Sequence, residues 1–427
     1  MLGKGVSACH IGTVTEPRTP LHIPDYRLFW TARFLSVLAT TGMVVIIGYQ
    51  LYDLARKAYG MSIAEASFML GVLGFVQFVP MFLLTPIAGV VADRFDRRHV
   101  GALAIGIDAM IALVLALGTQ MGWLTLPLLL GLAVAHGTAR VFVGPAISAI
   151  GPVIVPARIL PRAVAMNSMA MQAGSILGPA SAGLLFGHSA PLFYWSAAAL
   201  LAGAIVSLLA IRPLPPMASN RDVHPLRQVV HGFSYVRRNP FLLGCITLDL
   251  FAVLFAGATA LLPVYARDIL HVGATGLGQM RAAPAIGAAV FALILSVRPL
   301  QKNVGVTMLW AVGIFGLATA IFGLSTNYAL SLAMLTVLGA ADMISMFVRG
   351  SLVQLLTPED MRGRVSAISG LAISASNELG EMESGIAAAL LGAPGAVVLG
   401  GIGAIVITVM WAVLFPQIRR ARSFEIA

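Results

Sequence analysis

Three acidic side chains lie within six residues of an otherwise apolar stretch: Glu378, Glu381 and Glu383. Glu378 and Glu381 are three residues apart and would share one face of a helix, whereas Glu383 would point about 200° away from Glu381. Two carboxyl groups held close together away from water raise each other's affinity for a proton. The spacing therefore predicts a site that binds and releases protons, or the substrate itself. The alternative is that these glutamates form permanent ion pairs with Arg281 or Arg349.

Further charged residues interrupt apolar stretches of the chain. A charge inside a membrane is costly, so each is a candidate for proton or substrate handling. Asp342 and Arg349 are seven residues apart and would lie on nearly one face of a helix. This spacing fits a static ion pair and a functional role equally well. Arg140 either contributes to coupling or ties two helices together. The remaining candidates of this kind are Asp249 and Arg33.

The elements that carry these charges must be membrane-spanning helices. Of the 427 residues 59% are hydrophobic and only 10% are charged, and the mean hydropathy is +0.91, whereas soluble proteins have about 25% charged residues. Without water the backbone amides of such runs must pair within a helix. We therefore predict an all-α membrane protein with twelve transmembrane helices. The expected spans are 28–54, 68–91, 100–117, 124–147, 163–186, 192–211, 241–265, 276–297, 304–324, 329–352, 366–391 and 397–415.

The organisation predicted from these spans is six plus six. Most of the 27 lysines and arginines fall in alternate loops together with both termini, which places the termini in the cytoplasm. A shift of 202 residues aligns Gly178 with Gly380, which suggests two repeated halves. The expected regions are a tail at 1–27, a six-helix bundle at 28–211, a linker with an amphipathic helix at 212–240, a second six-helix bundle at 241–415 and a tail at 416–427.

The loop after the second span carries a recognisable pattern. Gly89, Asp93, Arg94, Arg97 and Arg98 fall on G-x-x-x-D-R/K-x-G-R-R/K, so the segment resembles the loop between the second and third helices of major facilitator superfamily transporters. An aspartate replaces the second glycine of the pattern. The resemblance implies a conformational latch, in which Asp93 sits against the start of the eleventh helix when the carrier faces outward. A generic positively charged loop is the alternative.

The fifth span carries a second pattern of the same superfamily. Gly174, Gly178, Pro179 and Gly183 resemble the antiporter signature G-x-x-x-G-P-x-x-G-G, although small residues four apart also serve ordinary helix packing. Arg140, four residues before a glycine, resembles the R-x-x-x-G motif linked to proton coupling. Together these motifs are similar to the enterobactin-exporter and macrolide-efflux branch of the drug:proton antiporters.

The resemblance implies a secondary active transporter of the bacterial inner membrane that exports an amphipathic small molecule, such as a drug or siderophore, by proton antiport through alternating access. The expected partners are the substrate, protons and membrane lipids, with no nucleic acid, and the expected state is a monomer. We expect no cofactor besides the proton gradient, no metal site and no catalytic residues, because neither a nucleophile–base nor a metal-ligand constellation is present. The alternatives are a proton-coupled importer and a non-transporting sensor or scaffold.

Overall fold

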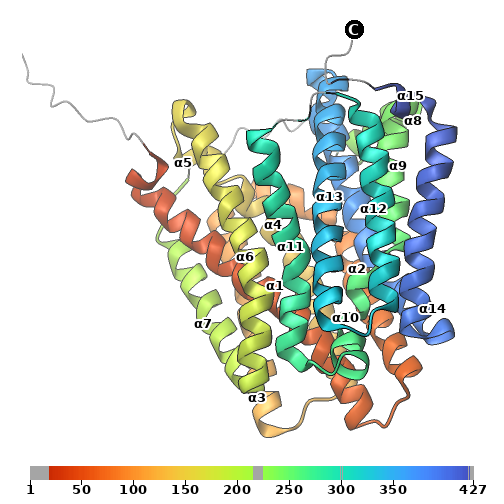
Figure 1. Cartoon of the computed structure of the whole chain (residues 1–427). Helices are drawn as coiled ribbons and strands as arrows, with labels where there is room; N and C mark the ends of the chain where they lie inside the picture. Colours follow the sequence, from red (N-terminus) through yellow and green to blue (C-terminus); the bar gives the residue numbers. More distant parts are fainter. Residues whose placement is uncertain (1–18, 215–224, 299, 301, 422, 424–427) are drawn as a thin grey trace, which may run out of the picture.

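Long helices run side by side through the molecule (Figure 1). The computed structural model describes residues 19–214, 225–298, 300, 302–421 and 423. The long helices are α1 Pro24–Lys57, α2 Ile63–Arg94, α3 Arg97–Met121, α4 Leu126–Ser148, α6 Leu160–His188, α7 Ala190–Leu209, α8 Pro225–Arg238, α9 Pro240–Phe255, α11 Gly273–Val297, α12 Val304–Leu324, α13 Tyr328–Leu356 and α14 Glu359–Leu414. The short helices are η1 Pro20–His22, α5 Gly151–Ile154, η2 Ala157–Ile159, η3 Ala258–Leu261, α10 Leu262–Val264, η4 Tyr265–Ile269 and α15 Pro416–Arg420.

Eleven helical segments of the described chain are long and apolar enough to cross a membrane. The last long helix, α14, has 56 residues and would be about 84 Å long if straight. That is far more than the roughly 30 Å of a bilayer core. The chain leaves helical geometry at Gly392, where φ is 75° and ψ is 158°, a conformation that glycine adopts readily. The helix reverses there, so its two arms are separate spans and the predicted total of twelve is confirmed.

The seventh predicted span, 241–265, is not one helix. Helix α9 ends at Phe255, and a 3-10 turn, one short α-helical turn and the π-helical η4 follow. A Cβ atom at Gly257 would lie 2.5 Å from Oγ of Ser384 and 2.7 Å from the carbonyl oxygen of Gly380. The break therefore coincides with a close approach of α14, while the apolar composition continues through it without a change.

Two helix pairs join the N-terminal group, α1–α7, to the C-terminal group, α9–α14. Helix α2 packs along α14, and α6 packs along α11. Glycines allow the closest approaches: a Cβ at Gly71 would be 3.1 Å from Cα of Gly385, and a Cβ at Gly183 would be 2.8 Å from Cα of Gly278. One cluster of buried apolar residues includes Leu73 of α2 together with residues of α11, so it spans both groups. These contacts hold the two groups together.

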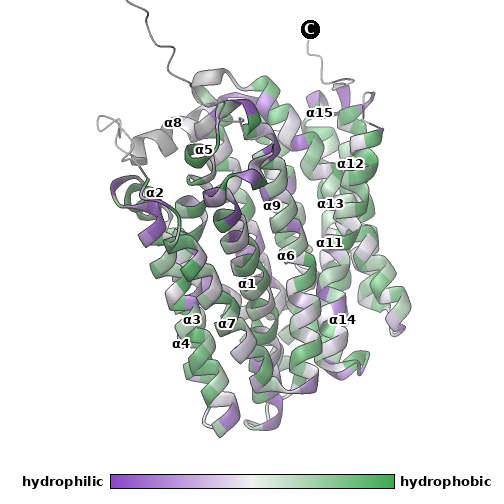
Figure 2. Ribbon diagram, turned by 90° about the vertical axis from the view of Figure 1, so that its left-hand side faces the viewer, coloured by the Kyte–Doolittle hydropathy of each residue, from purple (hydrophilic) through white to green (hydrophobic). Residues whose placement is uncertain are grey.

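The two ends of the bundle differ. Helices α8 and α15 lie at one end, which we call the termini end, and the turn after α3 and the reversal of α14 lie at the opposite, far end (Figure 1). Hydrophilic residues gather at the ends, and hydrophobic residues cover much of the helices between them (Figure 2). Such a distribution suits a protein that is surrounded by lipid along its length.

Candidate functional site

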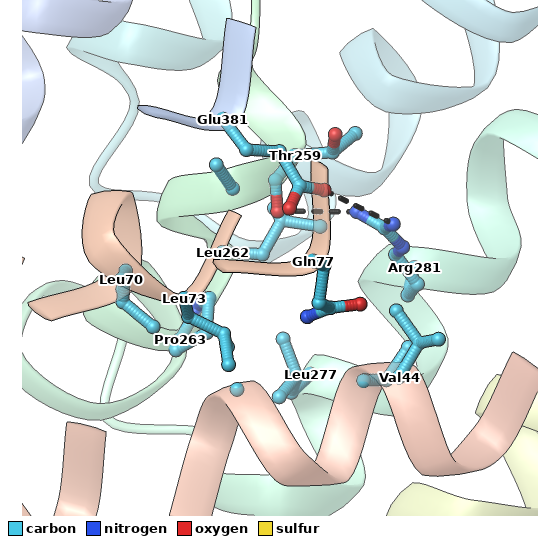
Figure 3. A pocket seen from close by; sticks show the side chains of 13 residues that line it. Val44, Leu70, Leu73, Gln77, Thr259, Leu262, Pro263, Leu277, Arg281 and Glu381 are labelled. Carbon is cyan, nitrogen blue, oxygen red and sulfur yellow. Dashed lines mark hydrogen bonds and ion pairs between the residues drawn. The ribbon is translucent and has the colours of Figure 1, made fainter. Parts of the chain in front are cut away.

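A narrow cavity of about 40 Å³ lies between the two helix groups (Figure 3). The N-terminal group lines it through α1 and α2, and the C-terminal group through η3, α10, α11 and α14. Its polar side chains are Gln77, Thr259, Arg281 and Glu381, while Val44 belongs to its apolar wall. The volume accommodates a few water molecules and no drug-sized molecule. The cavity is therefore the closed inner end of a central site.

Glu381 and Arg281 form the charged centre of this cavity. Their side chains approach to 3.9 Å, and Arg281 also donates a hydrogen bond to the carbonyl oxygen of Thr259 (Figure 3). Both side chains are about one quarter exposed. A Cβ at Gly74 would lie 2.8 Å from Cβ of Glu381, so only a very small residue allows α2 to approach this acidic face. Both residues of the pair lie in the C-terminal group, whereas residues of both groups line the cavity.

Glu378 forms the second ion pair, and this one crosses between the groups. Nη1 of Arg140 in α4 donates a hydrogen bond to Oε1 of Glu378 at 3.3 Å. Glu378 is 8% exposed, whereas the Arg140 side chain is 43% exposed. The predicted shared face of Glu378 and Glu381 is thus the face that meets two arginines. A change of charge on Glu378 would remove an attraction between the two helix groups.

On the termini side of these charged pairs, residues of α14 and α4 are open. Asn377 and Gly370 follow Glu381 along one face of α14, and both are exposed. A Cβ at Gly370 or at Gly144, one turn beyond Arg140, would meet no described atom within 4 Å. The Arg140–Glu378 pair can therefore be reached from the termini end.

The far end is closed by a charged network between α1 and η4, which we call the far-end lock. Asp53 pairs with Arg267 at 3.2 Å, and Arg56 pairs with Asp268 at 3.5 Å. The hydroxyl group of Tyr52 donates a hydrogen bond to Asp268 at 2.6 Å. Asp53, Arg267 and Asp268 are not among the site residues predicted from the sequence. No signal in the sequence pairs a residue at the end of α1 with one more than 200 positions later.

Replacing Asp268 with asparagine is expected to loosen the far-end lock. Partly exposed ion pairs contribute up to about 1 kcal/mol each, so opening at the far end should become about fivefold more frequent. The measurement is the labelling rate of a cysteine at Val45, in a chain without its native cysteines, by a membrane-impermeant thiol reagent applied from the far end. Glu65→Gln is the matched control, because Glu65 lies at the same end but bonds Ser62. Equal rates in Asp268→Asn and wild type would exclude the lock.

The remaining predicted charges lie away from the cavity. Arg349 of α13 forms a buried ion pair with Asp249 of α9, so its partner is neither of the glutamates nor Asp342. Asp342 lines a separate small cavity together with Asp249 and Ser345 inside the C-terminal group. Asp249, Asp342 and Arg349 form one cluster that holds α9 and α13 together.

A buried pair in the N-terminal group was also missed. Asp108 of α3 and His136 of α4 are both fully buried, with 2.8 Å between Oδ1 and Nδ1. Neither residue is among the predicted site residues, because helical spacing cannot match residues on different helices. Arg33 is the one predicted charge of α1, and it contacts the sulfur atom of Met171 at 3.2 Å.

The glycine pattern of α6 packs this helix against its neighbours. A Cβ at Gly174 would be 2.7 Å from Val37 of α1, and one at Gly178 would be 2.1 Å from the Thr41 hydroxyl group. Gly183 faces α11 instead. Gly174, Gly178 and Gly183 thus serve close helix packing, with Pro179 inside the helix. This packing joins α6 to both helix groups, so it lies where the groups would move against each other.

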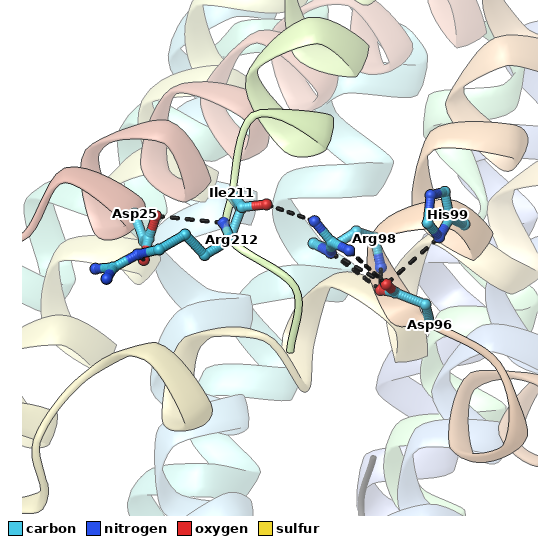
Figure 4. Close-up of polar contacts among 6 residues, drawn as sticks. All are labelled: Asp25, Asp96, Arg98, His99, Ile211 and Arg212. Atoms are coloured by element: carbon cyan, nitrogen blue, oxygen red, sulfur yellow. Dashed lines mark hydrogen bonds and ion pairs between the residues drawn. The ribbon is translucent and has the colours of Figure 1, made fainter. Parts of the chain in front are cut away.

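The loop between α2 and α3 is anchored within the N-terminal group. Arg97 donates hydrogen bonds to the carbonyl oxygens of Ala92 and Ala149. Arg98 donates one to the carbonyl oxygen of Ile211, as Figure 4 shows. Arg94 is exposed, and the side chain of Asp93 lies outside the described part. The latch contact that involves Asp93 therefore stays a prediction.

Asp96 is the capping residue directly before α3, at the position where the superfamily pattern has glycine. Its φ is −59°, its carboxylate accepts a hydrogen bond from the backbone amide of Arg98, and it pairs with Arg98 and His99 (Figure 4). Because φ is negative, the turn does not require glycine here. The hydrogen bond from Arg98 holds the pKa of Asp96 below its usual range, together with the backbone amide and the nearby charges.

Replacing Asp96 with alanine should destabilise the protein by about 1 kcal/mol, because a helix cap and an ion pair are lost. The pKa of Asp96 is lowered by folding, so this contribution is present above the unfolded-state pKa of about 3.9 and is lost as the pH falls through the lower folded-state pKa. Thermal unfolding should therefore show a difference between the two proteins at about pH 5 that shrinks below about pH 4. A difference that stays the same from about pH 5 to about pH 2 would contradict this assignment.

A membrane-embedded helical bundle with ion-paired carboxylates between two helix groups is typical of a membrane transporter of the major facilitator superfamily. The sequence matches the family model described as transmembrane secretion effector over residues 15–425. The chain belongs to this family, and it is a membrane transporter.

Curated relatives and solved structures agree with this assignment. The chain is 28% identical to the enterobactin exporter EntS of Escherichia coli O1:K1 over 379 residues, which cover 87% of this chain and 86% of the relative. The same values hold for the enterobactin exporter of Citrobacter koseri. A bacterial homologue of the lysosomal transporter Spinster, inward-facing and unoccupied, has a TM-score of 0.67 at 15% identity and covers 93% of this chain and 96% of its own. A bacterial homologue of ferroportin, also inward-facing, has a TM-score of 0.64 at 16% identity, with 93% and 99% covered.

Proposed function

We propose that this transporter exports an amphipathic small molecule, of the drug or siderophore type, in exchange for protons. The observation that carries the proposal is the ion pair between Arg140 and Glu378, which joins the two helix groups beside a second carboxylate, Glu381, in the central cavity. The enterobactin exporters among the relatives support export and a siderophore-like substrate.

The coupling follows from the charge on Glu378. When Glu378 is ionised, its attraction to Arg140 holds α14 and α4 together; when it is protonated, that attraction disappears and Arg140 is free to bind other groups. Glu381 and Arg281 form a second pair of a carboxylate and an arginine one turn away, within the C-terminal group. Protons and the hydrogen-bond donor groups of a substrate then compete for the same carboxylates, so the site exchanges one for the other as the groups rock between two arrangements.

The orientation in the membrane completes the proposal. We place the termini end in the cytoplasm, because the positive charges gather there. The protein resides in the bacterial inner membrane as a monomer surrounded by lipid, and the proton gradient is its only energy source. The conformation described here then admits substrate from the cytoplasm, with the far-end lock closed. The loop with Asp93, Arg94 and Arg97 acts as the latch of the opposite, outward-facing state.

The test uses everted membrane vesicles energised to an acidic interior, with a fluorescent dye that reports the pH difference. Cationic drugs, macrolides and catecholate siderophores are added in turn to vesicles with and without the protein. A substrate that dissipates the pH difference only when the protein is present supports proton-coupled export. If a substrate is accumulated by right-side-out vesicles and leaves the pH difference in everted vesicles unchanged, the proposed direction is wrong.

A further inference from the structure

Arg33 of α1 is a buried cation whose charge the described site does not balance. Its side chain is 9% exposed, and its Nε atom has no hydrogen-bond partner in the described part of the chain. The contact recorded for its guanidinium group is the Sδ atom of Met171, a weak and uncharged acceptor. A buried guanidinium group without a counter-charge costs several kcal/mol, so such a residue normally has an anionic partner.

The helix geometry places Arg33 on the face of α1 that lines the central cavity. Arg33 and Val44 are eleven residues apart, or roughly three full turns, and so differ by only about 20° around the helix. Val44 lines the cavity that contains Arg281 and Glu381 (Figure 3). Arg33 therefore lies on the same side as Val44, about 16 Å nearer the termini end.

Along this path, Arg33 is the positive charge for which the described part of the chain provides no acidic partner. Arg140 is matched by Glu378, and Arg281 is matched by Glu381. Arg33 is thus the unbalanced charge of these five, and it comes first on the way in from the termini end. Its surroundings are otherwise apolar and aromatic, because Met171 touches it and Trp30 lies one turn before it on α1.

We propose that Arg33 binds the anionic group of the transported molecule, so the substrate is an amphipathic organic anion that carries a carboxylate, sulfonate or phenolate group. This inference rests on the proposed export function and names its substrate class. The anion supplies the charge that the buried guanidinium group lacks, while its apolar part lies against the side chains of Met171 and Trp30 beside Arg33.

The test is equilibrium binding of two dansyl dyes to the purified full chain in phosphatidylcholine nanodiscs. Dansylglycine carries one negative charge and dansylamide carries none, and both share one fluorophore. Binding is followed by energy transfer from tryptophan, for which Trp30 is well placed. Arg33→Gln and Arg33→Lys are compared with wild type, and Arg419→Gln is the matched control because Arg419 is exposed at the termini end.

The expected result is that wild type binds dansylglycine at least tenfold more tightly than dansylamide. Arg33→Gln should remove this preference through weaker binding of dansylglycine alone, Arg33→Lys should keep part of it, and Arg419→Gln should keep all of it. The proposal is overturned if wild type shows no preference, including the case in which neither dye binds, or if Arg33→Gln retains the preference. It is also overturned if nanodiscs of phosphatidylglycerol lower the affinity of wild type for dansylglycine to that of Arg33→Gln, because a lipid phosphate then occupies Arg33. Binding needs no proton gradient, so these outcomes are independent of the vesicle assay.

Discussion

Replacing Glu378 with glutamine is expected to lower the rate of proton-driven export at least 100-fold. Glutamine keeps the size of the side chain and its hydrogen bond to Arg140, but it cannot ionise. Because Glu378 is 8% exposed and joins the two helix groups, its charge would control both proton binding and the attraction between α4 and α14. The measurement is the initial rate of substrate-induced loss of the pH difference in everted vesicles.

Glu383→Gln is the matched control for Glu378→Gln. Glu383 lies on the same helix but about 200° away from Glu381, and it is not among the residues that line the central cavity. This variant should keep more than half of the wild-type rate. Equal losses in both variants would mean that any charge change in this part of α14 damages the protein, and a wild-type rate in Glu378→Gln would remove Glu378 from the coupling mechanism.

Replacing Arg349 with methionine is expected to destabilise the protein by about 3–5 kcal/mol, since it leaves the carboxylate of Asp249 buried and unpaired. Both side chains of this pair are less than one tenth exposed. The measurement is the midpoint of thermal unfolding in detergent, followed by tryptophan fluorescence and by size-exclusion chromatography of the heated protein. The expected outcome is a clear decrease in the unfolding temperature and in the yield of monodisperse protein.

The double variant Asp249→Leu with Arg349→Met separates the ion pair from the packing. Because both charges are then gone, most of the lost stability should return. If the double variant is as unstable as Arg349→Met alone, the destabilisation comes from packing, and the pair has a smaller role than the structure suggests. Proton-driven export that is lost in the stable double variant would show that this cluster also takes part in transport.

Composition was sufficient to predict the class of fold. Runs of apolar residues long enough for a bilayer must be helices, and their number predicted twelve spans. The break after Phe255 was not predictable, because Gly257 and its neighbours continue the apolar run and the close approach of α14 is a tertiary feature. The reversal at Gly392 lies between two predicted spans, where a positive φ could be expected of a glycine.

The candidate site was predictable only within single helices. The spacing of Glu378 and Glu381 correctly placed both on one face, because helical periodicity relates residues three apart. The partners of charged residues on other helices did not follow from spacing. Arg349 contacts Asp249 about one hundred positions earlier, and Asp53 contacts Arg267 in the other helix group. Such pairs depend on how the helices pack, which local sequence patterns do not encode.

The most direct test of proton antiport uses purified protein in liposomes, where no other transporter is present. Substrate uptake is measured with the interior more acidic than the medium, with no pH difference, and with the interior more alkaline. Antiport predicts accumulation of substrate above its external concentration only with an acidic interior, and faster loss of preloaded substrate with an alkaline interior. Uptake that reaches the same level under all three conditions would contradict proton antiport.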